Sequence, residues 1–369
     1  MNILIFVIIL LVLVLVHEFG HFFTAKKFGI RVDEFGFGFP PKLFGIKKGE
    51  TEYTFNLLPI GGFVKIFGEN PDEENTNGPD SKRSFVNKPK WKQAIVLFAG
   101  VFMNFMLAWF LFSIGFMSGL PTSVGSEPWG YELSDVNTVI VSVLPDSPAE
   151  KAGLKSGDKI FSMYYPHQSI GISPGSTSPV LIKDAIIRNP NQEIVITYIR
   201  GKNQLYKTKV IPVVSSTSGK PSIGIAMDQI GTAKLPFFTA FKEGMALTLF
   251  VTKGTVLGLY GLILDSIQGK GSFDSVTGPI GMVGIVGDAY EFGFVYLLSF
   301  AALISINLAI INLLPFPALD GGRLFFLLIE KIKGSRMNPK FTNMANMIGF
   351  VLLIILMLVV TYHDVVKLF

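Results

Sequence analysis

The stretch Val12–Gly29, VLVLVHEFGHFFTAKKFG, places two histidines and a glutamate directly after a run of hydrocarbon side chains. The run itself, Ile3–Val16, is fourteen apolar residues. Counted through Phe23, the segment reaches the roughly 20 residues that a transmembrane helix needs. No positive charge precedes the run and no small-x-small cleavage site follows it, so we read it as a retained span and not as a signal peptide. We therefore expect a membrane helix that ends in titratable groups.

The composition of the chain is typical of a membrane protein with a soluble part. Hydrophobic residues make up 49% of the 369 residues and charged residues 16%, against about 25% charged in a soluble domain. The net charge of +5 comes from scattered lysines, which gives no support for nucleic-acid binding. The chain has no cysteine, which excludes disulfides and thiolate ligands, so a metal must be held by His, Asp or Glu.

Three further segments are long and apolar enough to be transmembrane helices, and a fifth segment is ambiguous. The three are Ala94–Met117, Phe294–Ala318 and Met347–Thr361, the last extended back toward residue 343. Lysines and arginines cluster after the first span and after the third, so the positive-inside rule places both loops in the cytoplasm. The ambiguous segment, Met245–Leu264, carries Lys253 as its single charge.

Two regions between the spans are predicted to contain strands. Glu52–Phe67 predicts a β-hairpin with its turn at Ile60–Gly62, and because both faces are apolar we expect it to lie against the membrane. Residues 135–230 predict a small mixed domain of strands and helices. Within it, Leu144–Ile160, LPDSPAEKAGLKSGDKI, resembles the turn–helix–turn signature of PDZ domains, which usually bind peptide ends at a sheet edge.

The polar groups of the first span match the pattern H-E-x-x-H. His17 and His21 share one face of a helix, so both imidazoles can reach one metal ion, and Glu18 beside them can act as a general base. The pattern occurs by chance in soluble helices, but an ionised carboxylate in hydrocarbon costs about 2.5–3.5 kcal/mol. Its position in the membrane therefore indicates a function; the alternative is an interfacial cluster that reaches the lipid headgroups.

A catalytic zinc has three protein ligands and an open position, so a third ligand must come from elsewhere in the chain. The third span ends in NLLPFPALDGGR, residues 312–323. Asp320 in this motif is the single acidic residue between Glu291 and Glu330, which makes it the natural candidate. The alternative is that Asp320 caps the helix that begins near Gly322.

The motifs together resemble the site-2 protease family, and most closely its RseP-type bacterial members, over nearly the whole chain. The resemblance rests on H-E-x-x-H in the first span, N-x-x-P-x-P-x-L-D-G in the third, and the inserted PDZ-like domain. It implies a zinc ion held by His17, His21 and Asp320, with Glu18 as catalytic base. It also implies that Asn312 contacts substrate, and Asn307, five residues earlier, is a second candidate for this role.

Two further stretches resemble family motifs. The stretch LLPIGGFVKI resembles the membrane-associated hairpin that engages the substrate strand, which makes Gly61, Gly62 and Phe63 candidate substrate contacts. The stretch AGVFMN, Ala99–Asn104, resembles the family pattern A-G-P-x-x-N with Val101 in place of proline.

The number of membrane crossings between the predicted ligands decides whether Met245–Leu264 spans the membrane. His21 and Asp320 lie at the far ends of their spans, so they can meet only if an even number of crossings separates them. If Met245–Leu264 also crossed, Asp320 would lie about 30 Å away on the opposite face. We therefore expect this segment to lie on the outer face as an amphipathic helix with Lys253 toward water.

The expected fold is a polytopic α-helical membrane protein with four transmembrane helices, a membrane-associated β-hairpin and one inserted extracytoplasmic PDZ-like α+β domain. The expected order is 1–24 first span, 25–93 cytoplasmic region with the hairpin at 52–67, 94–118 second span, 119–232 PDZ domain, 233–293 non-spanning region, 294–320 third span, 321–342 cytoplasmic loop and 343–366 fourth span.

The expected function is that of an intramembrane zinc endopeptidase in a bacterial cell membrane, with its active site near the cytoplasmic face. Its partners would be the lipid bilayer and single-pass transmembrane substrates such as anti-sigma factors or remnant signal peptides. Whether the PDZ domain binds a peptide or protein ligand, or only excludes bulky substrates, stays open. The alternatives from other classes are a PDZ-bearing membrane scaffold without enzymatic activity and a metal transporter.

Overall fold

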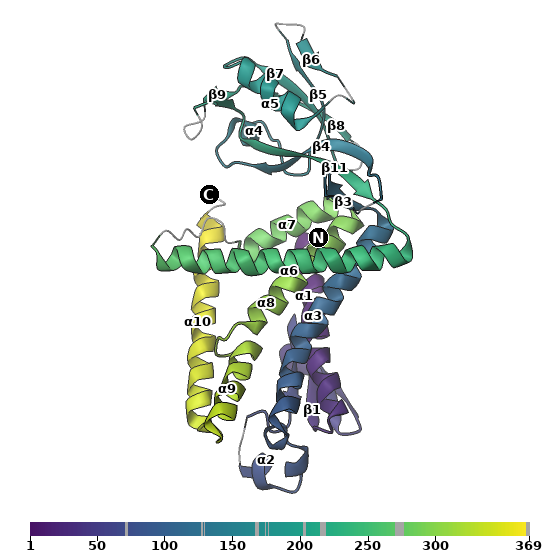
Figure 1. The fold of residues 1–369 in the computed structure, drawn as a ribbon. Helices are drawn as coiled ribbons and strands as arrows, with labels where there is room; N and C mark the ends of the chain where they lie inside the picture. The colour runs from purple at the N-terminus through teal and green to yellow at the C-terminus, as the bar shows by residue number, and fades with distance from the viewer. Residues whose placement is uncertain are drawn as a thin grey trace. The chain divides into compact units, whose positions relative to one another are not determined.

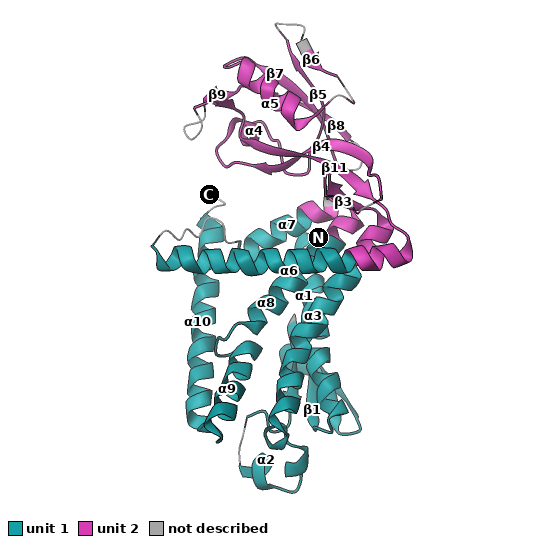
Figure 2. Ribbon diagram, in the orientation of Figure 1, with its two compact units in different colours: residues 1–112, 244–287, 298–369 teal, residues 113–243, 288–297 magenta. Residues whose placement is uncertain are grey.

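The computed structural model divides the chain into two compact units (Figure 2). The first comprises residues 1–112, 244–287 and 298–369, and the second comprises 113–243 and 288–297. The structure describes all residues except 71–72, 127, 129, 167–169, 174, 176, 202–203, 215–218, 270–276 and 367–369.

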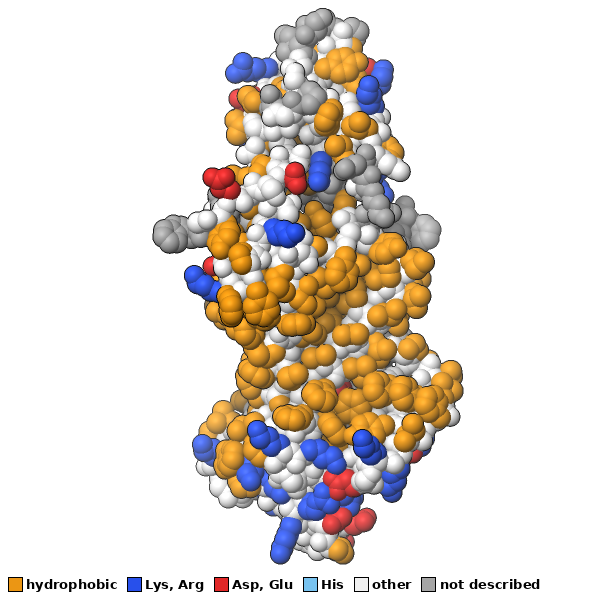
Figure 3. Space-filling model, turned by 90° about the vertical axis from the view of Figure 1, so that its right-hand side faces the viewer, with side chains coloured by type: hydrophobic (Ala, Val, Ile, Leu, Met, Phe, Trp, Pro, Cys, Tyr) orange, Lys and Arg blue, Asp and Glu red, His pale blue; other side chains and the backbone are white. Residues whose placement is uncertain are grey.

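Within the described residues, five helices are long and apolar enough to cross a membrane. They are α1 (Asn2–Lys27), α3 (Lys90–Ser118), α6 (Phe237–Ile267), α8 (Phe294–Leu313) and α10 (Pro339–Val366). Length and composition alone do not distinguish α6 from the other four. Its direction does, because α6 runs across the view in Figure 1 while α3 and α10 run along it. On the face shown in Figure 3, hydrophobic side chains form a band over this helical unit, and Lys and Arg side chains gather below that band.

A short loop, residues 314–319, connects α8 to the amphipathic helix α9 (Asp320–Lys333). Gly321 and Gly322 let the start of α9 pack closely against the end of α8 and this loop, since an added Cβ at either position would lie 2.2 Å from the carbonyl oxygen of Leu313 or Phe316. A real side chain does not tolerate such an approach, so these positions require glycine. Asp320 is the first residue of α9.

The sheet that follows α1 differs from the predicted hairpin. It consists of β1 (Val32–Lys48) and β2 (Thr51–Ile66), and Gly36 of β1 is paired with both Phe63 and Thr54 of β2. The first half of β1 therefore lies between the two halves of β2, which were expected to pair with each other directly. That pairing was wrong because a strand from outside the predicted hairpin intervenes. Gly36 permits this arrangement, since an added Cβ would lie 2.4 Å from the Phe63 ring.

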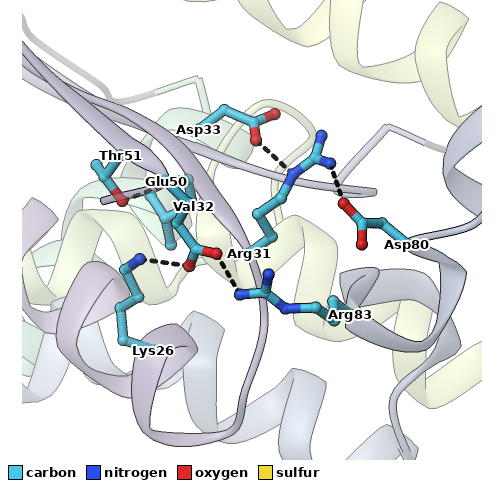
Figure 4. Close-up of polar contacts among 8 residues, drawn as sticks. All are labelled: Lys26, Arg31, Val32, Asp33, Glu50, Thr51, Asp80 and Arg83. Carbon is cyan, nitrogen blue, oxygen red and sulfur yellow. Dashed lines mark hydrogen bonds and ion pairs between the residues drawn. The ribbon is translucent and has the colours of Figure 1, made fainter. Parts of the chain in front are cut away.

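An ion-pair network holds the C-terminal end of α1 against this sheet (Figure 4). Glu50 accepts hydrogen bonds from Lys26 of α1, at 2.5 Å, and from Arg83. Arg31 donates to Asp80 at 2.6 Å. Burial opposes the charged form of Glu50, but the hydrogen bonds from Lys26 and Arg83 outweigh it and hold the pKa of this carboxyl below its ordinary value. Lys26, Arg31 and Arg83, which contributed to the prediction of a cytoplasmic loop, thus also form ion pairs within the fold.

The remaining elements of the first unit are short or lie beside the long helices. They are α2 (Glu73–Asn77), the 3-10 helices η1 (Ser81–Arg83) and η2 (Phe85–Asn87), and α7 (Pro279–Phe292), which also extends into the second unit. The Asp364 carboxylate of α10 accepts hydrogen bonds from the backbone N–H groups of Gly278 and Gly281, at 3.0 and 2.9 Å. These bonds satisfy free N–H groups at the start of α7 and tie it to the end of α10.

The second unit is built on a seven-stranded sheet with the order β3-β11-β4-β5-β7-β8, in which β6 pairs with β5. Apolar side chains of the sheet and of the helices α4 and α5 form its core, among them Ile140, Tyr165, Ile182 and Ile196. The elements are β3 (Leu120–Ser123), β4 (Ser134–Val143), α4 (Pro148–Lys151), β5 (Lys159–Tyr165), β6 (Ile170–Ile172), α5 (Pro179–Arg188), β7 (Ile194–Arg200), β8 (Gln204–Val210) and β11 (Ile225–Ala233), with the short pair β9 (Val213–Val214) and β10 (Pro221–Ser222) beside them.

The turn–helix–turn segment adopts the local structure that its sequence predicted. The Ser147 side chain caps α4 by accepting from the Glu150 backbone N–H at 3.2 Å. Gly153 follows the helix with a φ of 78°, a left-handed value that favours glycine. Asp158, directly before β5, is fully buried, and Arg200 pairs with it at 2.7 Å.

Candidate metal centre

Three side chains from the two ends of the sequence converge on one point. His17 Nε2 and His21 Nε2 lie 3.0 and 3.2 Å from Asp320 Oδ2, and 3.1 Å from each other. Ligand atoms at about 2.0–2.1 Å from a tetrahedral zinc ion are separated by about 3.3 Å, so these atoms are spaced as zinc ligands would be. Two imidazole nitrogens and a carboxylate oxygen also match the donor set of catalytic zinc sites. In the part of the chain that the structure describes, no other group of three such residues is found.

The two histidines are buried between α1 and α3, and glycines make room for them. An added Cβ at Gly100 of α3 would lie 2.4 Å from His21 Nε2 and 2.7 Å from His17 Cε1. At Gly20 of α1, an added Cβ would lie 2.4 Å from the Ala99 carbonyl oxygen. The two helices can therefore approach closely at this level, and the imidazole rings fill the space that side chains would otherwise occupy.

Asp320 faces the histidines and does not cap its helix. Leu319 occupies the position before α9 and makes no capping hydrogen bond with its side chain. The Asp320 carboxylate instead contacts both imidazoles. The alternative in which Asp320 serves as a helix cap is therefore not what the structure contains.

The remaining ring nitrogens of the two histidines also have polar neighbours. His21 Nδ1 lies 2.8 Å from the Val96 carbonyl oxygen, to which it can donate. His17 Nδ1 lies 3.3 Å from Nδ2 of Asn104. A hydrogen bond such as the one from His21 Nδ1 to Val96 holds a metal-binding imidazole in a fixed orientation.

A cavity of about 300 Å³ opens onto these residues, and Glu18 lies in its wall. Val64 of β2 lines the same cavity as Glu18. An added Cβ at Gly62 would lie 3.9 Å from Glu18 Cγ, so the second half of β2 runs directly along α1 at this level. The sheet therefore places backbone next to the residue proposed to move protons.

The substrate-contact candidates are only partly brought together. Asn312 and Phe63 line the cavity, and Gly62 faces α1 beside it. Gly61 instead lies against the Phe39 ring, where an added Cβ would be 2.9 Å away. Asn307 does not line the cavity either.

Asn307 lies on a different face of α8 from the cavity lining. Its side-chain oxygen accepts a hydrogen bond from Thr255 of α6 at 3.3 Å, and the residue does not line the cavity. This contact joins α8 to α6. The structure therefore offers no support for Asn307 as a substrate contact.

An ion pair in the cavity wall was missed from the sequence. Arg323 of α9 pairs with Glu69, which follows β2, and both residues line the cavity. Arg323 comes three residues after Asp320, so the helical period places it on nearly the same face of α9. That spacing was the available signal for Arg323, whereas no local pattern pointed to Glu69.

Comparison with known proteins shows which family the chain resembles. The family model described as Peptidase family M50 matches residues 5–356. A protein of Clostridium acetobutylicum is 35% identical over 370 aligned residues, covering 99% of this chain and 97% of its own length. The regulator of sigma-W protease RasP of Bacillus subtilis is 31% identical and covers 99% of this chain and 98% of its own length. The zinc metalloprotease RasP of Shouchella clausii gives the same identity and coverage.

Among solved structures, the PDZ domain of the SdrC-like protein from Listeria monocytogenes is 20% identical, with a TM-score of 0.21. It covers 26% of this chain and 93% of its own length. The family model and the relatives, by contrast, extend over nearly the whole chain, the membrane helices included. The chain therefore belongs to peptidase family M50, the site-2 proteases, and is a multi-pass zinc metalloprotease.

Proposed function

We propose that the chain is an intramembrane zinc endopeptidase that cleaves transmembrane segments of single-pass membrane proteins. The observation that carries the proposal is the convergence of His17, His21 and Asp320 within 3.2 Å of one another, with both histidines in the C-terminal half of the apolar helix α1. In this proposal the three side chains hold the zinc ion. When bound, zinc supplies Lewis acidity, which polarises a peptide carbonyl and lowers the pKa of water.

Glu18 is the proton carrier of the proposed reaction. Its carboxylate lies in the wall of the same cavity as the three ligands. It takes a proton from the attacking water and passes it to the nitrogen of the leaving amine, so that the peptide bond breaks without a net change in the carboxylate. The position of Glu18 in the cavity wall, together with His17, His21 and Asp320, supports this role.

The second half of β2 is the proposed docking edge for substrate. A transmembrane helix resists cleavage because its amides are bonded internally, so a stretch must unwind before it can react. Residues 62–66 pair with β1 along one edge and run along α1 beside the cavity. An extended substrate strand could add its backbone to this side of the sheet, with Phe63 and Asn312 in contact with it.

We place the zinc site near the cytoplasmic face, with the PDZ domain outside and α6 as a helix that does not span. Packing along one side of α6 supports this topology. Its Leu247 and Val251 contact a cluster of buried side chains from α3 and α8. The crosswise direction of α6 relative to α10 supports it as well (Figure 1). If α6 crossed the bilayer, the two halves of the metal site would lie on opposite faces.

The substrates we propose are single-pass membrane proteins of the kind that anti-sigma factors and remnant signal peptides represent. The name of the Bacillus relative, a regulator of sigma-W, favours the first of these. The deciding experiment is zinc-dependent cleavage of a model transmembrane peptide by the purified protein in detergent. Cleavage that stops on chelation and returns with zinc supports the proposal. Binding of peptide without cleavage would favour a scaffold, and zinc flux into liposomes without cleavage would favour a transporter.

A further inference from the structure

The side-chain amide of Asn104 is buried, and its oxygen has no hydrogen-bond partner among the described residues. The side chain lies in the middle of α3 with no exposed surface. Its Nδ2 lies 3.3 Å from His17 Nδ1, and its Oδ1 is buried without a hydrogen-bond partner among the described residues. Burying an amide in an apolar environment is unfavourable unless it is hydrogen-bonded. An asparagine at this position in a membrane helix therefore indicates a function.

The orientation of the His17 ring determines which kind of hydrogen bond Asn104 must make with it. Its Nε2 faces Asp320 and His21, so Nε2 is the nitrogen directed at the metal. A neutral imidazole that binds metal through one nitrogen carries its proton on the other, and that N–H needs an acceptor. The Nδ2 of Asn104 is a donor and cannot accept. The unpartnered Oδ1 of the same carboxamide can.

We infer that Asn104 positions His17 by accepting a hydrogen bond from its Nδ1–H through Oδ1. The two ends of a carboxamide have nearly the same shape, so a rotation of 180° exchanges them without moving other atoms. After this rotation the oxygen has a donor, and the imidazole has the acceptor that metal binding requires. His21 already has the equivalent arrangement, with the Val96 carbonyl oxygen 2.8 Å from its Nδ1.

The backbone of α3 is built to present this acceptor. Gly100 and Asn104 are four residues apart, so they share one face of the helix. Gly100 leaves space for both rings, and Asn104 closes that space at the His17 side. Ser305 of α8 donates to the Asn104 backbone carbonyl at 2.8 Å and holds this turn of α3 in place. This face of α3 therefore packs against both imidazole rings.

The inference rests on the proposed zinc site and is tested by zinc affinity, measured by competition with a chromogenic chelator. Asn104→Leu keeps a similar volume and removes the acceptor, and we expect zinc to bind about 10–100-fold more weakly. Asn104→Asp presents acceptors only, and we expect it to bind zinc as tightly as the wild type or more so. If the leucine variant does not fold, Asn104→Ala takes its place with the same expectation.

Ser305→Ala is the matched control, because it loosens the contact of α3 with α8 without touching a histidine. A hydrogen bond between membrane helices contributes about 0.6 kcal/mol, so zinc affinity should change by no more than about threefold. Full zinc affinity in the leucine or alanine variant would overturn the inference. So would an aspartate variant that binds zinc as weakly as the leucine variant, since Asn104 would then act as a donor.

A spectroscopic readout separates positioning from general loss of structure. The chain has four histidines, so ¹⁵N-histidine labelling gives few signals. In the zinc-loaded wild type we expect His17 to carry its proton on Nδ1, and the aspartate variant to keep this signature. A zinc-loaded wild type in which His17 Nδ1 carries no proton would overturn the inference. Failure of the zinc site itself would appear differently, as unchanged zinc affinity in His21→Ala.

Discussion

Asp320 Oδ2 lies 3.0 Å from His17 Nε2, although 303 residues separate the two positions in the sequence. The contact joins the start of α9 to the C-terminal half of α1. It therefore depends on how α1, α3 and α8 pack, and a metal held there would link the two ends of the chain. Zinc binding should consequently report on the tertiary structure of the helical unit as well as on the chemistry of its ligands.

Replacing Glu18 with glutamine should separate metal binding from catalysis. The amide has the same shape as the carboxylate but cannot take a proton, and it leaves all three proposed ligands in place. We expect normal zinc content by elemental analysis and cleavage reduced by about 10²–10⁴-fold. The comparison variant, His21→Ala, should lose zinc and activity together. Substantial cleavage by Glu18→Gln would end the proposed role of this residue.

Gly100→Ala should impair the metal centre without altering a polar group. The new methyl group would lie 2.4 Å from His21 Nε2, so α1 and α3 must separate or the rings must turn. Such overpacking costs about 1–3 kcal/mol, and we expect a marked loss of zinc from purified protein. Gly254→Ala on α6 is the control, since nothing lies within 4 Å of its added Cβ. Equal zinc content in the two variants would contradict the described packing.

Cysteine labelling should show that α6 does not cross the membrane. Because the chain has no native cysteine, single cysteines at Lys242 and Gln268, both exposed, can be read without background. We expect both to react with an impermeant thiol reagent added outside intact cells. A cysteine at Lys27, after the first span, should be protected until the cells are opened. Labelling at only one of the two α6 positions would mean that the helix spans, and the three-ligand site would then be impossible.

Removal of the β-rich domain should leave the chemistry intact. Leu120 and Ala233 are directly paired in the β3–β11 ladder, so the ends of the domain meet and a short linker can join them. We expect the shortened protein to bind zinc and to cleave a short, pre-trimmed substrate. If the domain acts as a filter, the shortened protein should also cleave an untrimmed substrate that the full chain refuses. A folded, zinc-loaded protein without activity would instead show that catalysis needs the domain.

Glu50 should stabilise the C-terminal end of α1 in a pH-dependent way. Its pKa is lower in the folded protein than its ordinary value of 4.5, so the stabilisation is fully present above pH 4.5 and is lost as the pH falls through the folded value. Glu50→Gln should therefore lower the midpoint of thermal unfolding at pH 7, with a difference that shrinks as the pH is taken below 4.5. A gap that persists unchanged in acid would mean that charge is not its cause.

Much of the site could be predicted because its signals are local. The spacing of His17 and His21 places both rings on one helix face, since a helix turn is about 3.6 residues. The same local logic predicted the capped turn of α4, and it named Asp320 because no other acidic residue lies near it in a long stretch of chain. The assignment of these residues to zinc and to catalysis stays a prediction that the experiments above can test.

Only the tertiary structure decided which groups face one another across elements. Sequence spacing could not reveal that the first half of β1 separates the two halves of β2, since strand pairing depends on which segments meet in space. It also could not show that Asn307 turns toward α6, or that Asn104 reaches His17. Local periodicity determines the face on which a side chain lies, whereas helix crossing and sheet register determine what that face meets.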